Sequence, residues 1–376
     1  MIMLIMKILI QHRHFNNEIS GVLTYIHAII AEVQARGIEV KIISTKQDNL
    51  ANWLNDIAWA DIVHMNSNNL FFIMLCKALQ KKIVIKYHYC IYQSTHTIYE
   101  PMTLTQRLKI EWKQTLPKAN YPLKWKLHTF VKWARLFTRL STALLADYHT
   151  ACSDFLAQSS SFPWTVETLY NPIAIKSKTP IKSLENLSHP YHFIFVGRLS
   201  KDKGVDILLK AARLLQDEKK EFQVTIIGDG EQARELKQLA SNLQITHKVN
   251  FLGKMSQTEV QLKVQDALAL IAPSRWQEPA GYVVLEASSV QTCSIVSKMG
   301  GLPEVAGSHS LFFDNEDVEG LAKCMGYCLD NPDEVIKRGF QSSQYVAEKF
   351  SAAGAATRLL EICSQLAPKA LVTTSD

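Results

Sequence analysis

The sequence of 376 residues is longer than a single hydrophobic core usually supports, so we expect two domains. Hydrophobic residues make up 47% and charged residues 20% of the chain, which is ordinary for a globular protein and excludes a chain dominated by disorder. No apolar run reaches the ~20 residues that span a bilayer, and the seven cysteines follow neither a disulfide framework nor a zinc-binding spacing. We therefore expect a cytoplasmic protein without a bound metal.

Short runs rich in Ile and Val alternate with helix-sized segments in the first half of the chain. Such runs are typical of parallel strands joined by crossover helices. The sequence thus predicts a doubly wound parallel sheet in an N-terminal domain of residues 1–172, which closes at the turn Asn171-Pro172. The predicted strands are residues 7–11, 39–44, 61–66, 82–87, 144–153 and 166–171.

The turn after the first strand contains Ser20-Gly21 and leads into a helical pattern of apolar residues that ends at Gly37. A glycine at a strand-to-helix turn lets the backbone approach an anionic ligand closely. The same glycine could equally do no more than shape the turn. Gly21 is therefore a candidate site residue with a structural alternative.

His88 follows the fourth predicted strand, in the run Lys86-Tyr87-His88-Tyr89. Open α/β sheets bind their ligands at the carboxyl ends of parallel strands, which is where His88 is expected. A lone histidine is more often structural than functional, and His64 and His96 are weaker candidates still. We single out His88 because of its position after a strand.

The segment 101–140 is the most basic part of the chain, with a net charge of +8 against +6 for the whole sequence. Trp112, Trp125 and Trp133 are interleaved with the cations. A charge run is usually a solvated helical face. The alternative is a surface that meets anionic lipid, where each basic residue contributes roughly 1 kcal/mol. The segment contains one acid, Glu111, and nine cations: Arg107, Lys109, Lys113, Lys118, Lys124, Lys126, Lys132, Arg135 and Arg139.

The second half repeats the strand-and-helix alternation after a polar linker that runs to Pro190. We expect a second doubly wound domain over residues 173–350, with a cleft between the two halves. A final helical stretch, 351–376, is expected to end in a frayed tail from about residue 367. The predicted strands are residues 193–197, 224–228, 249–253, 267–274 and 294–298.

Two cations follow the first strand of this second domain, in the run Gly197-Arg198-Leu199-Ser200-Lys201-Asp202-Lys203-Gly204. An arginine fork and a lysine point charge at the carboxyl end of a strand can together hold a diphosphate. The alternative is a pair of ordinary surface cations. We favour the diphosphate because the loop leads directly into an amphipathic helix.

Two carboxylates lie farther along, where a loop with Glu278 leads into a helix with Glu286. Ionised carboxylates accept strong, charge-assisted hydrogen bonds, which suits the hydroxyls of a sugar or a ribose. The backbone N–H groups from Gly281 through Tyr282 to Val283 would lie at the start of that helix, where its dipole favours a phosphate. Hydroxyls and phosphates together indicate a nucleotide sugar.

These motifs carry a resemblance to a known family. The pattern E-P-x-G-x-x-x-x-E of residues 278–286, the Gly300-Gly301-x-Pro303-Glu304 run and the G-R-L-x-x-x-K-G pattern of residues 197–204 resemble the retaining glycosyltransferases of family 4. The resemblance implies the GT-B fold, an α/β architecture of two Rossmann-like domains facing a cleft. It also implies that the C-terminal helix crosses back onto the N-terminal, acceptor-side domain.

The resemblance implies a role for each candidate residue. Arg198 and Lys203, after Gly197, would contact the donor phosphates, as would Gly21 and the backbone of 281–283. Glu286 would bind the ribose and Glu278 the transferred sugar, with His88 beside that sugar. Lys254 and Met255 would border the base. The chain departs from the family at Ser20, Ala280, Gln291 and Cys293, so the identity of the donor is the least determined of these points.

The implied function is a retaining, metal-independent hexosyl transfer from a nucleotide-diphosphate sugar, which would be a substrate rather than a cofactor. The acceptor would be a hydroxyl of a glycan, a lipid-linked sugar or a small molecule, in the assembly of polysaccharide or glycolipid. Nucleic acid is not an expected partner, and the segment 101–140 could contact the inner face of an anionic membrane. The alternatives are a sugar-nucleotide epimerase or a phosphorylase on the same fold, or a catalytically silent scaffold for polyanions.

Overall fold

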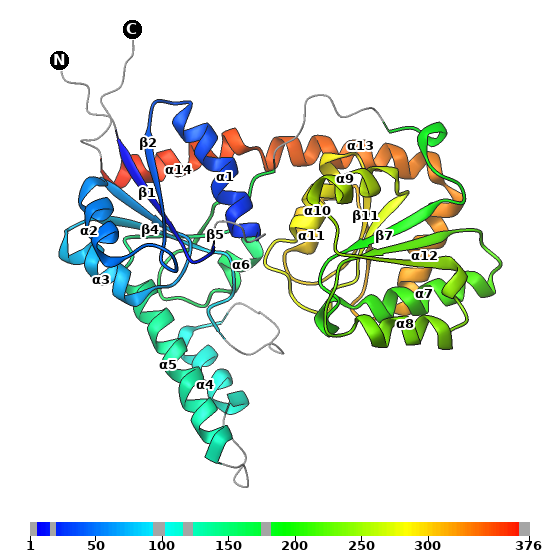
Figure 1. The fold of residues 1–376 in the computed structure, drawn as a ribbon, viewed down its shortest axis with the longest axis horizontal. Coiled ribbons are helices and arrows are strands. Elements are labelled where there is room, and N and C mark those ends of the chain that lie inside the picture. Colours follow the sequence, from blue (N-terminus) through cyan, green and yellow to red (C-terminus); the bar gives the residue numbers. More distant parts are fainter. Residues whose placement is uncertain (1–5, 16–19, 93–101, 116–122, 174–181, 368–376) are drawn as a thin grey trace. The chain divides into compact units, whose positions relative to one another are not determined.

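The computed structural model describes residues 6–15, 20–92, 102–115, 123–173 and 182–367, with the backbone alone at 123–128. His96, Lys118, part of the predicted linker and the predicted tail lie outside the described residues. The chain divides into two compact units (Figure 1). Unit 1 comprises Met1–Pro172 with Ala352–Asp376, and unit 2 comprises Ile173–Ser351.

Unit 1 contains a six-stranded sheet in the order β2-β1-β3-β4-β5-β6, in which every pairing is parallel. The central strand β3 is buried along its whole length and β4 is buried at every residue but Lys82, which explains why the two appear in the sequence as apolar runs. The strands are β1 Lys7–His12, β2 Glu39–Ser44, β3 Ile62–Met65, β4 Lys82–Tyr87, β5 Tyr148–Ala151 and β6 Glu167–Thr168.

The helices of unit 1 include the last helix of the described chain, α14, which packs against α1. Leu359 and Ile362 of α14 share a core cluster with Tyr25 and Ile29 of α1. The cap of α1 is Ser20, whose Oγ accepts a hydrogen bond from the N–H of Leu23 at 3.2 Å. The helices are α1 Gly21–Gln34, α2 Leu50–Trp59, α3 Leu70–Ala78, α4 Leu104–Thr115, α5 Leu123–Leu145, α6 Asp154–Ser159 and α14 Ala352–Leu366.

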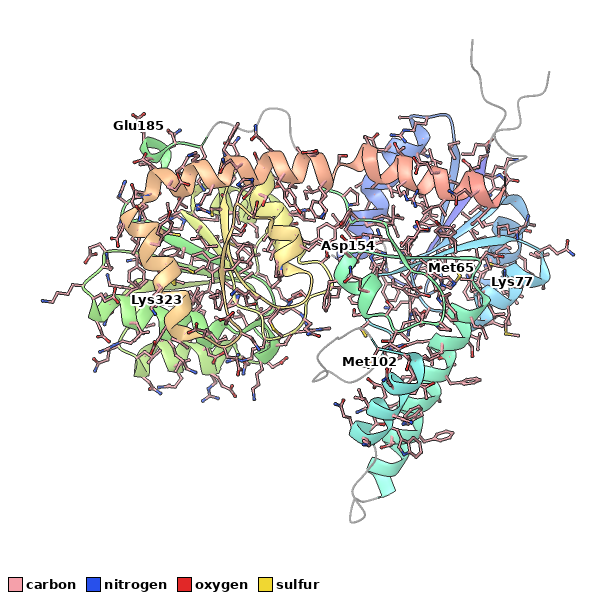
Figure 2. The ribbon with its side chains drawn as sticks, turned by 180° about the vertical axis from the view of Figure 1, so that it is seen from behind. Met65, Lys77, Met102, Asp154, Glu185 and Lys323 are labelled. Carbon is pink, nitrogen blue, oxygen red and sulfur yellow. The ribbon has the colours of Figure 1, made fainter. Side chains whose placement is uncertain are left out.

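Helices α4 and α5 form a hairpin that extends away from the sheet of unit 1 (Figure 1). The base of the hairpin is held by α3, which packs against α5. Lys77 of α3, which is labelled in Figure 2, pairs with Asp147, just after α5, at 2.6 Å. No helix in the described part of the chain is both long enough and apolar enough to cross a membrane.

Unit 2 contains a second six-stranded parallel sheet, in the order β12-β11-β10-β7-β8-β9. In its core, the buried apolar face of α7 packs against the strands and against α12. The strands are β7 His192–Val196, β8 Gln223–Ile227, β9 Val249–Gly253, β10 Ala269–Ala272, β11 Cys293–Ser297 and β12 Leu311–Phe313. The helices are α7 Val205–Asp217, α8 Ala233–Asn242, α9 Gln257–Asp266, α10 Tyr282–Ser289, α11 Leu302–Ala306, α12 Val318–Asp330 and α13 Pro332–Lys349, with 3₁₀ turns at Leu184–Asn186, Lys201–Lys203 and Thr246–Lys248.

Four strands, β5, β6, β10 and β12, differ from the sequence-based prediction. The strand predicted at 144–153 begins only at Tyr148, because α5 continues to Leu145. The edge strand β12 was not predicted; it has three residues, too few to show a periodic pattern. The other predicted strands lie within one or two residues of the observed ones, except β6 and β10, which are shorter than predicted.

Candidate active site

The strand order of unit 2 places two loops next to each other at the carboxyl edge of its sheet. The chain runs from β7 outward to β8 and β9, then returns to β10 on the other side of β7. Such a reversal is the point at which open parallel sheets bind their ligands. The two loops are the β7 loop, residues 197–204, and the β10 loop, residues 273–281.

The β7 loop is packed directly against the turn that follows β8. The N–H of Gly197 donates to the carbonyl of Ile227 at 3.0 Å, and the N–H of Leu199 donates to the carbonyl of Asp229 at 2.9 Å. A Cβ on Gly228, which has a φ of 135°, would lie 1.8 Å from the carbonyl oxygen of Gly197. The Gly-Asp-Gly turn is therefore required by close backbone packing.

Arg275 ties the β10 loop to the β7 loop and to α7. The N–H of Arg275 donates to the carbonyl of Asp202 at 2.8 Å. The guanidinium donates to both carboxylate oxygens of Asp206, at 2.6 and 2.8 Å, and its Nε donates to Glu316 at 2.6 Å. Burial alone would raise the pKa of Asp206, but its bonds with Arg275 and Lys210 outweigh burial and lower it.

Lys203 and Glu278, the predicted phosphate-binding cation and sugar-binding carboxylate, form an ion pair with each other. The Oγ of Ser274 also donates to Glu278, at 2.7 Å. Both charged side chains are partly shielded from water, which strengthens the attraction between them. The structure thus brings these two predicted residues together, from loops 75 positions apart in the sequence.

The position of Glu278 is fixed by the pair of glycines before α11. The N–H of Gly301 donates to the carbonyl of Glu278 at 2.7 Å. Gly300 has a φ of 62°, and a Cβ there would lie 2.5 Å from backbone atoms of Gln277 and Glu278. The Gly-Gly run in the sequence therefore serves a close approach between two backbones.

Glu286 lies on α10 and is half-buried. Burial raises the pKa of this carboxyl group, while a hydrogen bond from the side chain of Gln257 acts in the opposite direction. Gln257 is the first residue of α9, so this bond places Glu286 close to the β9–α9 connection that contains Lys254 and Met255. Lys254 is exposed and Met255 is half-buried.

Helix α10 begins directly after Gly281, which has a φ of 81°. The N–H groups of residues 281–283 therefore belong to the N-terminal end of α10, as predicted, where the helix dipole favours an anion. Arg198 is exposed, and its guanidinium lies 3.6 Å from the carboxylate of Asp202. The predicted residues of unit 2 thus lie along one edge of its sheet, on the β7, β9 and β10 connections and on α10.

His88 and Gly21, the remaining candidates, belong to unit 1. Gly21 is the first residue of α1. His88 is buried one residue beyond β4, and its Nε2 lies 2.9 Å from Oδ1 of Asn66. Burial, and then the charge of Lys86, hold the pKa of His88 well below its usual value, so the ring is neutral at pH 7.

Lys86, two residues before His88, is a buried lysine that the sequence did not single out, and burial holds its pKa well below its usual value. Its Nζ lies 3.4 Å from the centre of the Tyr25 ring and donates to the carbonyl of Tyr170 at 3.3 Å. The hydroxyl of Tyr25 in turn lies 2.9 Å from Nε2 of His64, whose pKa burial lowers to about 3. The sequence could have indicated Lys86, because it stands two positions before His88, and residues two apart on a strand lie on the same face of the sheet.

Arg275 was also missed, although it stands in the same run as Glu278. Its partners are 69 and 41 positions away in the sequence, and no local spacing indicates them. Among the described residues, no group of three or more His, Cys, Asp or Glu side chains is arranged to hold a metal ion.

Comparison with known proteins connects unit 2 with one family. Residues 177–342, less than half of the chain, match the family model described as Glycosyl transferases group 1. A glycogen synthase of Mycobacterium tuberculosis is 28% identical over 188 residues, which are 50% of this chain and 45% of that protein. A D-inositol 3-phosphate glycosyltransferase of Corynebacterium urealyticum is 29% identical over 181 residues, 46% of this chain and 42% of that protein. The chain thus spans less than half the length of these curated relatives.

The fold is shared with solved structures over nearly the whole chain. HepE of Anabaena, solved in complex with UDP, superimposes with a TM-score of 0.70 at 17% sequence identity, covering 96% of this chain and 100% of that one. This likeness, together with the two parallel sheets, shows that the chain has the two-domain α/β architecture of the GT-B fold.

Proposed function

We propose that this chain is a glycosyltransferase that moves a sugar from a nucleotide diphosphate to a hydroxyl group of an acceptor. One observation carries the proposal: Lys203, Glu278, Arg198 and the N-terminus of α10 gather at the reversal point of a sheet whose sequence matches Glycosyl transferases group 1. Cations and a helix N-terminus suit a diphosphate, and carboxylates suit hydroxyl groups.

Unit 2 would bind the donor. Arg198, Lys203 and the start of α10 would contact the diphosphate, and Glu286 would accept hydrogen bonds from the ribose. Lys254 and Met255 would border the base. The HepE structures with UDP and with UDP-glucose support testing UDP-sugars as the first donors.

The chemical step would depend on electrostatic stabilisation of the leaving group. As the bond from the sugar to the diphosphate breaks, negative charge grows on the phosphate oxygens. Arg198 and Lys203 would stabilise that charge without a metal ion, which is usually the largest catalytic contribution. Glu278 would hold a hydroxyl of the sugar whose anomeric carbon gains positive charge.

We further propose that the reaction retains the anomeric configuration, as the resemblance to family 4 implies. The acceptor hydroxyl would attack on the face from which the diphosphate leaves, and a phosphate oxygen would take its proton. Unit 1 would supply the acceptor side. Its neutral His88 would orient groups by hydrogen bonding rather than by charge.

The first test is a screen of nucleoside diphosphates and nucleotide sugars by thermal shift and by donor hydrolysis. Arg198→Ala and Lys203→Ala should each lower turnover about 100-fold, the usual cost of one electrostatic donor. Lys201→Ala is the matched control, because Lys201 lies in the same turn but is exposed and has no proposed role. Turnover by both site variants within a few-fold of Lys201→Ala would contradict the proposal.

A second measurement separates the two carboxylates. Glu286→Ala should weaken the binding of a free nucleoside diphosphate in calorimetry, because the ribose loses its acceptor. Glu278→Ala should leave that binding intact and slow only the sugar-dependent step. Equal losses in both variants would refute this division of roles, and sugar inversion without transfer would favour an epimerase.

A further inference from the structure

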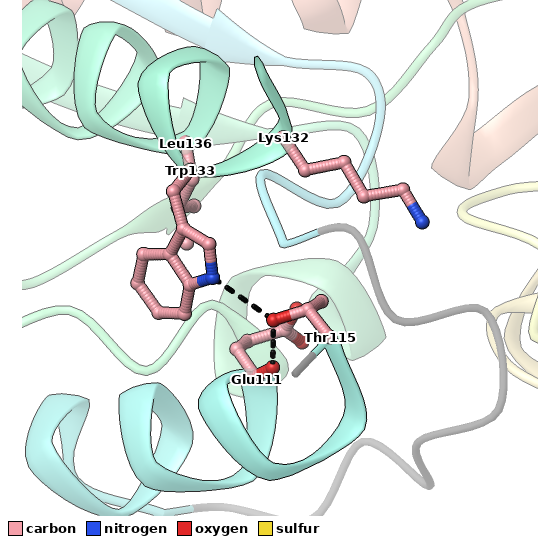
Figure 3. A pocket seen from close by; sticks show the side chains of 5 residues that line it. All are labelled: Glu111, Thr115, Lys132, Trp133 and Leu136. Atoms are coloured by element: carbon pink, nitrogen blue, oxygen red, sulfur yellow. Dashed lines mark hydrogen bonds between the residues drawn. The ribbon is translucent and has the colours of Figure 1, made fainter. Parts of the chain in front are cut away.

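The two helices of the α4–α5 hairpin pack against each other through a polar contact, drawn in Figure 3, and an aromatic one. Nε1 of Trp133 donates to Oγ1 of Thr115 at 2.9 Å, and the Trp112 and Trp133 rings meet edge to face at 5.3 Å. Arg107 and Glu111 form an ion pair at 3.1 Å that is almost completely buried. Trp133 and Glu111, the single acid of the hairpin, therefore contact other residues of the hairpin and do not form its outer surface.

The outer side of α5 instead presents apolar side chains to solvent. Phe130, Phe137 and Leu144 are 70%, 69% and 70% exposed. They are spaced seven residues apart, two helical turns each, so they lie on one side of the helix. Ala134, four residues after Phe130, lies on the same side and is also exposed. We call Phe130, Phe137 and Leu144 the α5 stripe.

The apolar exposure is not confined to α5. The neighbouring helix α3, which packs against α5, exposes Phe71 and Met74, each by 54%. Single exposed apolar residues are normal on soluble proteins, but large aligned ones mark an interaction surface. The α5 stripe is therefore a surface that needs a partner.

The charge of the hairpin indicates which kind of partner the α5 stripe binds. Helices α4 and α5 together contain eight Lys or Arg residues and one acid, the buried Glu111. Lys109, Lys113 and Arg135 are exposed on the described part of the hairpin. A second copy of the chain would oppose one basic helix to another, so like charges argue against a dimer through this face. A negatively charged partner complements it.

We propose that the α5 stripe docks unit 1 onto an anionic lipid leaflet. The apolar side chains would enter the boundary between headgroups and acyl chains while the flanking cations contact the headgroups, the arrangement of an interfacial amphipathic helix. The proposal extends the cationic surface predicted from the sequence by assigning insertion to Phe130 and Phe137 rather than to Trp133, which packs inside the hairpin. It does not rest on the proposed transfer reaction.

The test is co-sedimentation of the full chain with vesicles of equimolar phosphatidylglycerol and phosphatidylcholine, and with vesicles of phosphatidylcholine alone. The wild-type chain should bind the anionic vesicles and release them as salt rises, because the Debye length shrinks from ~10 Å at 0.1 M to ~3 Å at 1 M. Phe130→Ser with Phe137→Ser should weaken partitioning about tenfold or more, since each ring contributes substantial apolar burial. Leu262→Ser removes a comparably exposed side chain from α9 in unit 2 and should change nothing.

A charge variant separates the electrostatic contribution to vesicle binding from the apolar contribution. Lys109→Glu with Lys113→Glu should weaken binding at low salt while leaving the apolar surface unchanged. Thermal melting checks that every variant folds, and analytical ultracentrifugation checks its oligomeric state. Absence of wild-type binding to anionic vesicles at low salt, equal binding by the Phe130/Phe137 variant, or a dimer that this variant dissolves would each overturn the proposal.

Discussion

Replacing Arg275 by methionine tests how the two loops of the candidate site are held together. Arg275 makes two bonds to Asp206, at 2.6 and 2.8 Å, and one to Glu316 at 2.6 Å. Methionine keeps much of the aliphatic length but none of these donors. The substitution therefore leaves Asp206, in the first turn of α7, without its main partner.

The expected loss of stability follows from how deeply the Arg275–Asp206 pair is buried. Hydrogen bonds to charged groups contribute about 1.5–3 kcal/mol each, and removing one partner of a buried pair costs about 3–5 kcal/mol. The side chains of Arg275 and Asp206 are 20% and 24% exposed, so water screens the pair in part. We expect a loss of about 2–3 kcal/mol, below the cost of breaking a fully buried pair.

The assay is thermal unfolding followed by a double-mutant cycle. For a domain of this size a loss of 2–3 kcal/mol corresponds to a midpoint lower by about 4–12 °C. Arg275→Met, Asp206→Leu and the double variant should show a coupling free energy of about 1 kcal/mol or more. Lys298→Met is the matched control, because its pair with Asp314 is 55% and 73% exposed and contributes little. An Arg275→Met midpoint no lower than that of the control would refute the reasoning.

Two further predictions concern Glu286 and Gly300. Burial raises the pKa of Glu286, and the ribose hydroxyls would bind its ionised form. The affinity for a nucleoside diphosphate should therefore be full above that raised pKa and fall as the pH drops through it. Calorimetry with Glu286→Gln should show a weaker pH dependence of binding, and a pH profile identical to that of the wild type would count against the role. Gly300→Ala should destabilise unit 2 and disturb the Glu278 loop, whereas Gly37→Ala, at a φ of 77° with no atom within 4 Å of the new Cβ, should cost only the left-handed backbone strain of about 1–2 kcal/mol. Equal melting temperatures for the two alanine variants would exclude the predicted backbone clash.

The fold was largely predictable because its strands are parallel and buried on both faces. The runs around Ile8, Ile83 and Ile226 are short stretches rich in Ile and Val, and each forms a strand that pairs with a neighbour on both sides. The short edge strand β12 and the end of α5 were not predictable, because their boundaries depend on neighbours rather than on local pattern. Propensity alone does not determine such boundaries.

The basic segment shows where sequence pattern is insufficient. Its charge was evident from composition, but Trp133 packs inside the α4–α5 hairpin while Phe130 and Phe137 point outward. Which side of a helix faces its neighbour depends on the phase of the packing, and a helix with large apolar residues on several sides leaves that phase undetermined. The sequence therefore indicated the cations of this surface but not which of its aromatic residues face outward: Trp112, Phe130 and Phe137 are exposed, whereas Trp133 packs inside the hairpin.

The candidate site divides in the same way, into residues that a motif reveals and residues that only the fold brings together. Lys203, Glu278 and Gly281 lie in loops with recognisable local patterns, so the sequence indicated them directly. What holds them is a set of contacts between distant segments: Arg275 with Asp206, and Gly300 against the backbone of Glu278. A loop positioned by such contacts loses little conformational entropy when a ligand binds. This is the physical reason for attaching the ligand-binding residues to a rigid edge of the sheet. The supporting residues are therefore as much a part of the site as those that would touch the donor.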